Sequence, residues 1–200
     1  MKATLTGTAQ EERAGGVATD AAGNVYQALA AGGPVAGQPH AGDKDLVLVK
    51  DSPAGARLWA RSLGTAGLER GYGVAVDSAG NVVVTGYTKG DLDGAHAGNT
   101  TDDGFVAKYA PDGSREWVRQ FGVPAVADRG YAIATDATGN IYVTGYTRGA
   151  LAGPNQGDKD IYILKLDPSG AQLWLKQFGS PGEDKAWGSR RPATGFGSAG

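Results

Sequence analysis

Recurring acid–arginine pairs are the first feature of this sequence that could do chemistry. Each is an acidic residue followed by arginine, and the pairs are Glu12-Arg13, Glu69-Arg70 and Asp128-Arg129. A ring of such arginines could bind anionic ligands, because a guanidinium forms two parallel hydrogen bonds to a carboxylate or phosphate. A position that recurs in every repeat more often bridges neighbouring repeats, and we favour that structural interpretation.

Histidines and aspartates in two expected loops offer a second chemistry, the binding of a divalent cation. His40 and His96 are aligned, and Asp91 and Asp93 stand as in the first positions of a calcium-binding loop. The other calcium ligands and the closing glutamate are absent, and the histidine spacing matches no known metal site. We therefore predict no cofactor and no metal ion, with weak calcium binding as the alternative.

Recurring aspartates and tryptophans are better explained by structure than by catalysis. Asp20, Asp77 and Asp136 each begin an Asp-x-x-Gly-Asn segment, in which an aspartate bonds its own backbone in a turn. This role is favoured over a carboxylate array for acid–base catalysis. The tryptophans Trp59, Trp117 and Trp174 alternate with basic residues on an expected outer strand. We predict that they pack between repeats rather than forming a platform for sugars.

Composition excludes several classes of function. The chain has 200 residues, with 19 Lys and Arg against 21 Asp and Glu, and a formal net charge of −2. This near-neutral charge favours neither nucleic acid nor a membrane surface, and no apolar run approaches the roughly 20 residues of a membrane span. The sequence has no cysteine, which excludes disulfides, thiolate metal sites and cysteine nucleophiles. The first residues carry no apolar segment of a signal peptide, so we expect none in this sequence.

Internal repeats with a period of about 58 residues determine the fold. In the middle copy, runs rich in β-branched and aromatic residues predict strands at about 72–76, 82–87, 104–109 and 115–121. No segment shows a convincing helical period, so the chain is predicted to be all-β. Four antiparallel strands per repeat indicate β-propeller blades, at about 8–64, 65–122 and 123–179. Residues 2–6 are expected to be a strand of a preceding blade, and residues 189–200 a disordered or aberrant tail.

The repeat resembles a known family. The pattern Arg-Gly-Tyr-x-[Val/Ile]-Ala-x-Asp-x-x-Gly-Asn, followed by Gly-Tyr-Thr, Asp-x-[Phe/Tyr]-[Val/Ile]-x-Lys and Trp-x-x-x-Phe-Gly, is similar to the bacterial SBBP β-propeller repeat. It is strongest at residues 70–88 and 129–147 and covers about residues 2–188. The resemblance implies a propeller of about seven blades in secreted or cell-surface proteins, often with no assigned activity. It implies no catalytic residues.

An open array of blades leaves its terminal sheet faces uncovered. Apolar faces and unpaired strand edges of this kind favour association. We expect self-association, or further blades that close the ring, and treat residues 1–188 as one repeat domain.

The long loops and the blade-to-blade connections fall on one rim, where loops on a rigid scaffold commonly carry function. We predict a non-catalytic module that presents this rim to a protein or glycan. The alternatives are a cation-assisted hydrolase or lyase on a propeller scaffold, and a non-functional gene fragment. The candidate binding residues on this rim are Arg13, Glu69, Arg70, Asp91, Asp93, His96, Asp128 and Arg129.

Overall fold

Twelve strands make up the regular structure of residues 9–94 and 101–186, the part of the chain that the computed structural model describes. They form three four-stranded antiparallel sheets, each built from consecutive strands. Blade 1 contains β1 (Glu12–Thr19), β2 (Val25–Ala31), β3 (Asp45–Asp51) and β4 (Arg57–Leu63). Blade 2 contains β5 (Glu69–Val76), β6 (Val82–Thr88), β7 (Asp103–Tyr109) and β8 (Arg115–Phe121). Blade 3 contains β9 (Asp128–Thr135), β10 (Ile141–Thr147), β11 (Asp160–Leu166) and β12 (Gln172–Phe178).

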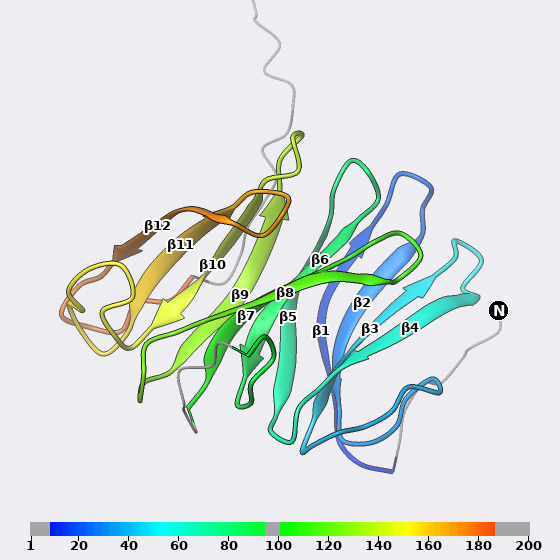
Figure 1. The fold of residues 1–200 in the computed structure, drawn as a ribbon, viewed down its shortest axis with the longest axis horizontal. Coiled ribbons are helices and arrows are strands. Elements are labelled where there is room, and N and C mark those ends of the chain that lie inside the picture. Colours follow the sequence, from blue (N-terminus) through cyan, green and yellow to red (C-terminus); the bar gives the residue numbers. More distant parts are fainter. Residues whose placement is uncertain (1–8, 95–100, 187–200) are drawn as a thin grey trace, which may run out of the picture.

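The three sheets stand side by side and do not close into a ring (Figure 1). The first strands of the blades are neighbours, since β5 contacts both β1 and β9. These strands therefore lie innermost, while β4 and β12 lie at opposite outer ends of the array. The prediction of an all-β chain of propeller blades is confirmed. None of the described segments is a helix that could cross a membrane.

Each short hairpin turn is held by its own aspartate, as the sequence predicts. Asp77 Oδ1 accepts hydrogen bonds from the backbone N–H groups of Ala79 and Asn81, both at 2.9 Å. The Asn81 side chain donates to the other carboxylate oxygen at 2.8 Å. Gly80 has a φ of 84°, a conformation that glycine adopts without steric cost. Asp20 and Asp136 repeat these bonds in the other blades, so their structural role is confirmed.

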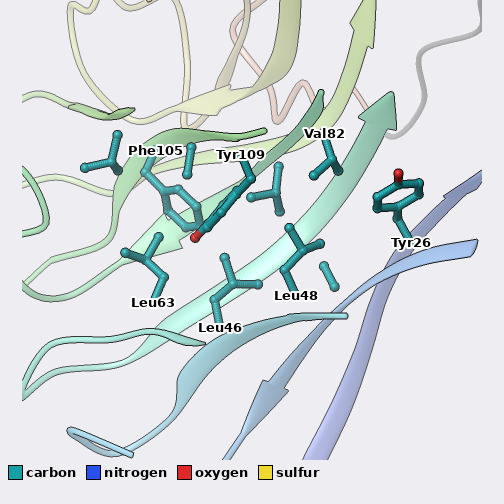
Figure 2. Packing of buried hydrophobic residues seen from close by; sticks show 11 residues of the cluster. Tyr26, Leu46, Leu48, Leu63, Val82, Phe105 and Tyr109 are labelled. Carbon is teal, nitrogen blue, oxygen red and sulfur yellow. The ribbon is translucent and has the colours of Figure 1, made fainter. Parts of the chain in front are cut away.

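The hydrophobic core lies between blades rather than inside one sheet. One buried cluster joins Leu46 and Leu48 of blade 1 to Val82 and Phe105 of blade 2 (Figure 2). A second cluster joins blade 2 to blade 3 in the same way. Because apolar burial is the dominant favourable term in folding, each blade is stabilised by its neighbour.

Trp59 and Trp117 pack between consecutive blades, as predicted. Each indole Nε1–H donates to a proline carbonyl in the next blade, Trp59 to Pro111 at 3.1 Å and Trp117 to Pro168 at 3.2 Å. Trp174 differs, because its side chain remains 37% exposed at the end of the array. The expected strand at residues 2–6 and tail at 189–200 lie outside the described residues.

Candidate functional site

Bulges in the innermost strands place a row of tyrosines near the axis of the blades. The register between β5 and β6 shifts between Gly71 and Gly73, which leaves Tyr72 at the irregularity. Tyr131 occupies the same place in β9. A β-bulge inserts an unpaired residue and redirects its side chain. Glycine is required opposite, because a Cβ on Gly86 would lie 1.8 Å from the Arg70 carbonyl oxygen.

The tyrosines form a continuous aromatic contact from blade 2 to blade 3. The ring centroids of Tyr87 and Tyr72 are 5.9 Å apart, those of Tyr72 and Tyr131 4.9 Å, and those of Tyr131 and Tyr146 5.6 Å. Burial raises the pKa of Tyr146 to about 12 and also raises that of Tyr72. Both hydroxyls therefore keep their protons near neutral pH.

Arg129 is the polar centre of this row. Its guanidinium carbon lies 4.3 Å from the Tyr87 ring centroid and 5.9 Å from that of Tyr146. Its Nε donates to Asp102 Oδ2 at 2.7 Å, and its Nη2 bonds the same oxygen. Burial acts to lower the pKa of Arg129, but the hydrogen bonds and charge of Asp102 outweigh it and raise that pKa. The predicted bridging role of the arginine is thus realised here, since Asp102 and Tyr87 belong to blade 2.

An open cavity of about 590 Å³ lies beside Arg129, between blades 2 and 3. Its walls come from the β8–β9 connection and from the loop between β10 and β11, both on the rim of long loops. Arg148 and Asp158 face each other across 3.0 Å in this wall, and both side chains are largely exposed. The lining residues are Thr101, Ala125, Val126, Ala127, Arg129, Tyr146, Arg148, Asn155, Gly157 and Asp158. The cavity combines a fixed cation with an exposed and exchangeable ion pair.

The predicted acids Glu69 and Asp128 are buried supports of the blade connections rather than exposed ligands. Glu69 accepts hydrogen bonds from the Thr65 backbone and hydroxyl at 2.7 Å and from the Thr88 hydroxyl at 2.6 Å. Asp128 accepts from the Val123 backbone at 2.7 Å. Both residues lie within strands and are fully buried. Both acids stand at the rim ends of their strands, where the blade connections fold back onto them.

Burial also shifts the pKa values of these two acids. It raises the pKa of Asp128 to about 6, and the nearby Asp103 carboxylate adds to the rise, while bonds from Thr147 and Val123 oppose it. Burial likewise raises the pKa of Glu69. Asp128 is therefore poised to take up a proton in mildly acidic solution.

Arg70 and Arg13 do not reproduce the arrangement of Arg129. The Arg70 guanidinium lies 4.8 Å from the Tyr72 centroid, and its buried Nε has no hydrogen-bond acceptor among residues 9–94 and 101–186. In blade 1, which precedes the blade of Arg70, the residue aligned with Asp102 is Lys44, and Lys44 donates to Glu11. Arg13 also pairs with Glu11 and is exposed. The three arginines therefore do not form a uniform ring.

The remaining predicted residues lie apart from the cavity. Asp93 accepts a hydrogen bond from the Gln120 backbone at 2.7 Å, and Asp91 accepts one from Gly94 at 2.7 Å, so both carboxylates tie down their loop. His96 lies outside the described residues. Within residues 9–94 and 101–186, no group of three or more histidine, aspartate or glutamate side chains could hold a metal ion.

The tyrosines and the Arg129–Asp102 contact were absent from the predicted site residues. Two sequence signals pointed to them. The tyrosines belong to the recurring Arg-Gly-Tyr and Gly-Tyr-Thr segments, and Asp102 departs from the repeat, where Lys44 and Lys159 stand in the other copies. A polar residue that breaks a repeat marks a place where one blade differs from the others.

A curated relative is similar in sequence to most of this chain. The regulatory protein FlaEY of Caulobacter vibrioides is 34% identical over 194 residues, which cover 90% of this chain and 19% of that protein. The chain thus spans about a fifth of the length of this relative.

Solved structures with a similar chain path include two enzymes. A gluconolactonase from Xanthomonas campestris is 14% identical, with a TM-score of 0.46 over 86% of this chain and 48% of that chain. A luciferin-regenerating enzyme is 15% identical, with a TM-score of 0.44 over 88% of this chain and 49% of that chain.

A family profile matches the repeats directly. Residues 58–93 and 116–151 match the SBBP family, described as a β-propeller repeat. Each match begins in the outer strand of one blade and ends in the loop that follows the second strand of the next. Residues 58–93 and 116–151 of this chain are therefore SBBP β-propeller repeats, the repeat family that the sequence pattern resembles.

Proposed function

We propose that this chain is a non-catalytic interaction module that binds a protein partner at the cavity between blades 2 and 3. The observation that carries the proposal is Arg129, held between Tyr87 and Tyr146 and fixed by Asp102. Arginine and tyrosine are enriched at the energetically important centres of protein interfaces. A prearranged arginine loses little conformational entropy when a partner binds.

The surroundings of Arg129 favour a protein over a glycan. Sugar recognition by stacking needs an open aromatic face, but Tyr87 is 6% exposed and Tyr146 4% exposed. Arg148 and Asp158 in contrast are exposed at the cavity mouth and can exchange their mutual contact for charged groups of a peptide. The FlaEY relative is named as a regulatory protein, which is compatible with a role in binding.

Selection of peptides from a random display library tests this function. Peptides enriched on the wild-type chain are expected to lose binding to Arg148→Glu, because that change reverses one charge at the cavity mouth. Lys176→Glu is the matched control, since Lys176 is an exposed cation on β12, away from the cavity. No enrichment, or equal binding to Arg148→Glu and wild type, would contradict the proposal.

A further inference from the structure

The contact between consecutive blades, here called a joint, uses the same four residue types at both interfaces of the described structure. One blade supplies a tryptophan and a lysine, the donor half, and the next blade supplies a turn with a proline and a glycine, the acceptor half. A tryptophan ring covers a turn glycine of the next blade, and a lysine joins the tryptophan in donating to the turn's proline carbonyl. In the first joint, Trp59 and Lys50 donate to the Pro111 carbonyl at 3.1 and 3.3 Å. A Cβ on Gly113 would lie only 2.9 Å from Trp59 Cδ2, which shows how closely the ring covers the turn.

The second joint repeats this arrangement one blade further along. Trp117 and Lys108 donate to the Pro168 carbonyl at 3.2 and 3.1 Å. A Cβ on Gly170 would lie 3.0 Å from Trp117 Cδ2. Two copies with matching partners define a specific contact rather than general apolar packing.

Blade 3 presents the donor half of a third joint. Trp174 packs edge-on against Tyr142 at 6.3 Å, and Lys165 lies 5.0 Å from the same ring. The paired half in blade 1 has almost the same geometry, with Trp59 at 5.9 Å and Lys50 at 5.0 Å from Tyr26. The donors are therefore already arranged, yet Trp174 is 37% exposed and Phe178 beside it 51% exposed.

Blade 1 presents the matching acceptor half. Its turn carries Pro53 and Gly55, and Gly55 has a φ of 77°, close to the 83° of Gly113. A Cβ on Gly55 would meet nothing within 4 Å, so no ring from the described part of the chain covers this turn. Val17 is 65% exposed, whereas Ile133 at the same place in blade 3 is 5% exposed.

The two unfilled halves stand at opposite ends of the array, so they cannot meet within one chain (Figure 1). We propose that Trp174 and Lys165 of one copy dock on the Pro53–Gly55 turn of a second copy, which joins the copies head to tail. The occupant is another copy because this chain itself carries the turn that fits. A net charge of −2 per copy opposes the contact only weakly.

The centre of the blade 1 face that carries the Pro53–Gly55 turn is already covered, so a second copy can contact only the edge of this face. Val47 and Val49 of blade 1 are already buried in a cluster with Val35 of their own loop. The docking surface therefore consists of the turn and the 65% exposed Val17. A small heterologous contact of this kind forms reversibly and either closes a ring or extends a chain of copies.

Site-directed cross-linking tests the geometry, because the chain has no cysteine of its own. In the first joint, Arg61 Nη2 donates to the Asp112 carbonyl at 3.1 Å, and the residues at the corresponding positions of the free halves are Lys176 and Ala54. Lys176→Cys and Ala54→Cys variants are mixed and treated with a short bis-maleimide. Cross-links are expected in the mixture and not in either variant alone.

Sedimentation velocity over a concentration series measures the association itself. Wild type is expected to self-associate, and Trp174→Ala to weaken the association at least about tenfold. Gln172→Ala is the matched control, because Gln172 is exposed on the same strand and lies opposite Leu166, which packs toward blade 2, so this change should leave the association unaltered. Thermal unfolding checks that both variants are folded.

Three outcomes would overturn the proposal. They are a wild-type monomer at every concentration, association that survives Trp174→Ala, and cross-linking of either cysteine variant with itself, which would indicate a symmetric contact.

Discussion

At the scale of single residues, the contact between Arg129 and Asp102 distinguishes blade 2 from the other blades. Asp102 is buried, and the Arg129 side chain is 28% exposed, so neither group is fully hydrated. Removing one partner from such a pair leaves the other charge poorly solvated, whereas removing both costs much less. The pair therefore fixes the arginine that faces the cavity.

Asp102→Ala is expected to lower the free energy of unfolding by about 2–3 kcal/mol, somewhat less than for a fully buried pair. The double variant Asp102→Ala with Arg129→Met should recover part of this loss. Urea denaturation of the wild type, both single variants and the double variant measures the coupling. Additive losses in the double variant would show that the two side chains do not interact.

The raised pKa of Asp128 predicts a pH dependence of stability. Below about pH 4 the carboxyl group is protonated in both states, since an unfolded aspartate has a pKa near 3.9. Between about pH 4 and 6 the unfolded chain loses this proton while the folded chain keeps it. This residue's contribution to the free energy of unfolding therefore falls as pH rises through that window, by at most about 3 kcal/mol.

Asp128→Asn should remove that fall, so the difference in stability between variant and wild type should shift in favour of the variant as pH rises from about 4 to 6. Denaturation curves at several pH values measure it. Asp158→Asn is the control, because Asp158 is exposed. A constant difference between Asp128→Asn and wild type over this range would contradict the burial of a titrating carboxyl group.

At the scale of strands and turns, stability depends on the joints between blades. Trp117 lies inside a joint and Trp174 at a free end, although they occupy the same position in the repeat. Trp117→Ala should lower the free energy of unfolding by about 3 kcal/mol. Trp174→Ala should change it by less than about 1 kcal/mol in dilute solution. Chemical denaturation compares them, and equal losses would mean that Trp117 makes no special contact.

Substituting two turn glycines distinguishes the cost of backbone strain from the cost of displacing a tryptophan ring. Gly55 and Gly113 have similar positive φ values, but only Gly113 is covered by an indole ring. Alanine at either position should cost about 1–2 kcal/mol for the left-handed backbone. Gly113→Ala should cost clearly more than Gly55→Ala, because Trp59 must move. Equal costs in thermal unfolding would argue against the joint.

Most strands and turns could be predicted from the sequence, because the residue patterns that indicate them are local. The prediction missed the start of the strand β5, placing it at 72 rather than at Glu69. Glu69 and Arg70 pair with Thr88 and Tyr87 inside the sheet, but charged residues are not typical of a strand, so the sequence does not indicate this pairing. Arg129 is among the predicted residues, but the arrangement of its partners could not be predicted, since it depends on a bulge at Tyr131 and on a contact with Asp102 in another blade.

At the scale of the whole molecule, each blade relies on its neighbours. The two main buried clusters both span two blades, and blade 2 contributes to each. In repeat proteins, stability is approximately the sum of repeat terms and nearest-neighbour interfaces. Because three blades share two large interfaces, we expect them to unfold together.

Differential scanning calorimetry tests this central claim most directly. The account predicts one transition in dilute solution, with a calorimetric enthalpy equal to the van't Hoff enthalpy. Trp59→Ala and Trp117→Ala, which affect different joints, should both move that single transition to lower temperature. Two resolved transitions in the wild type, of which each variant shifts only one, would show that the blades fold separately and would contradict the account.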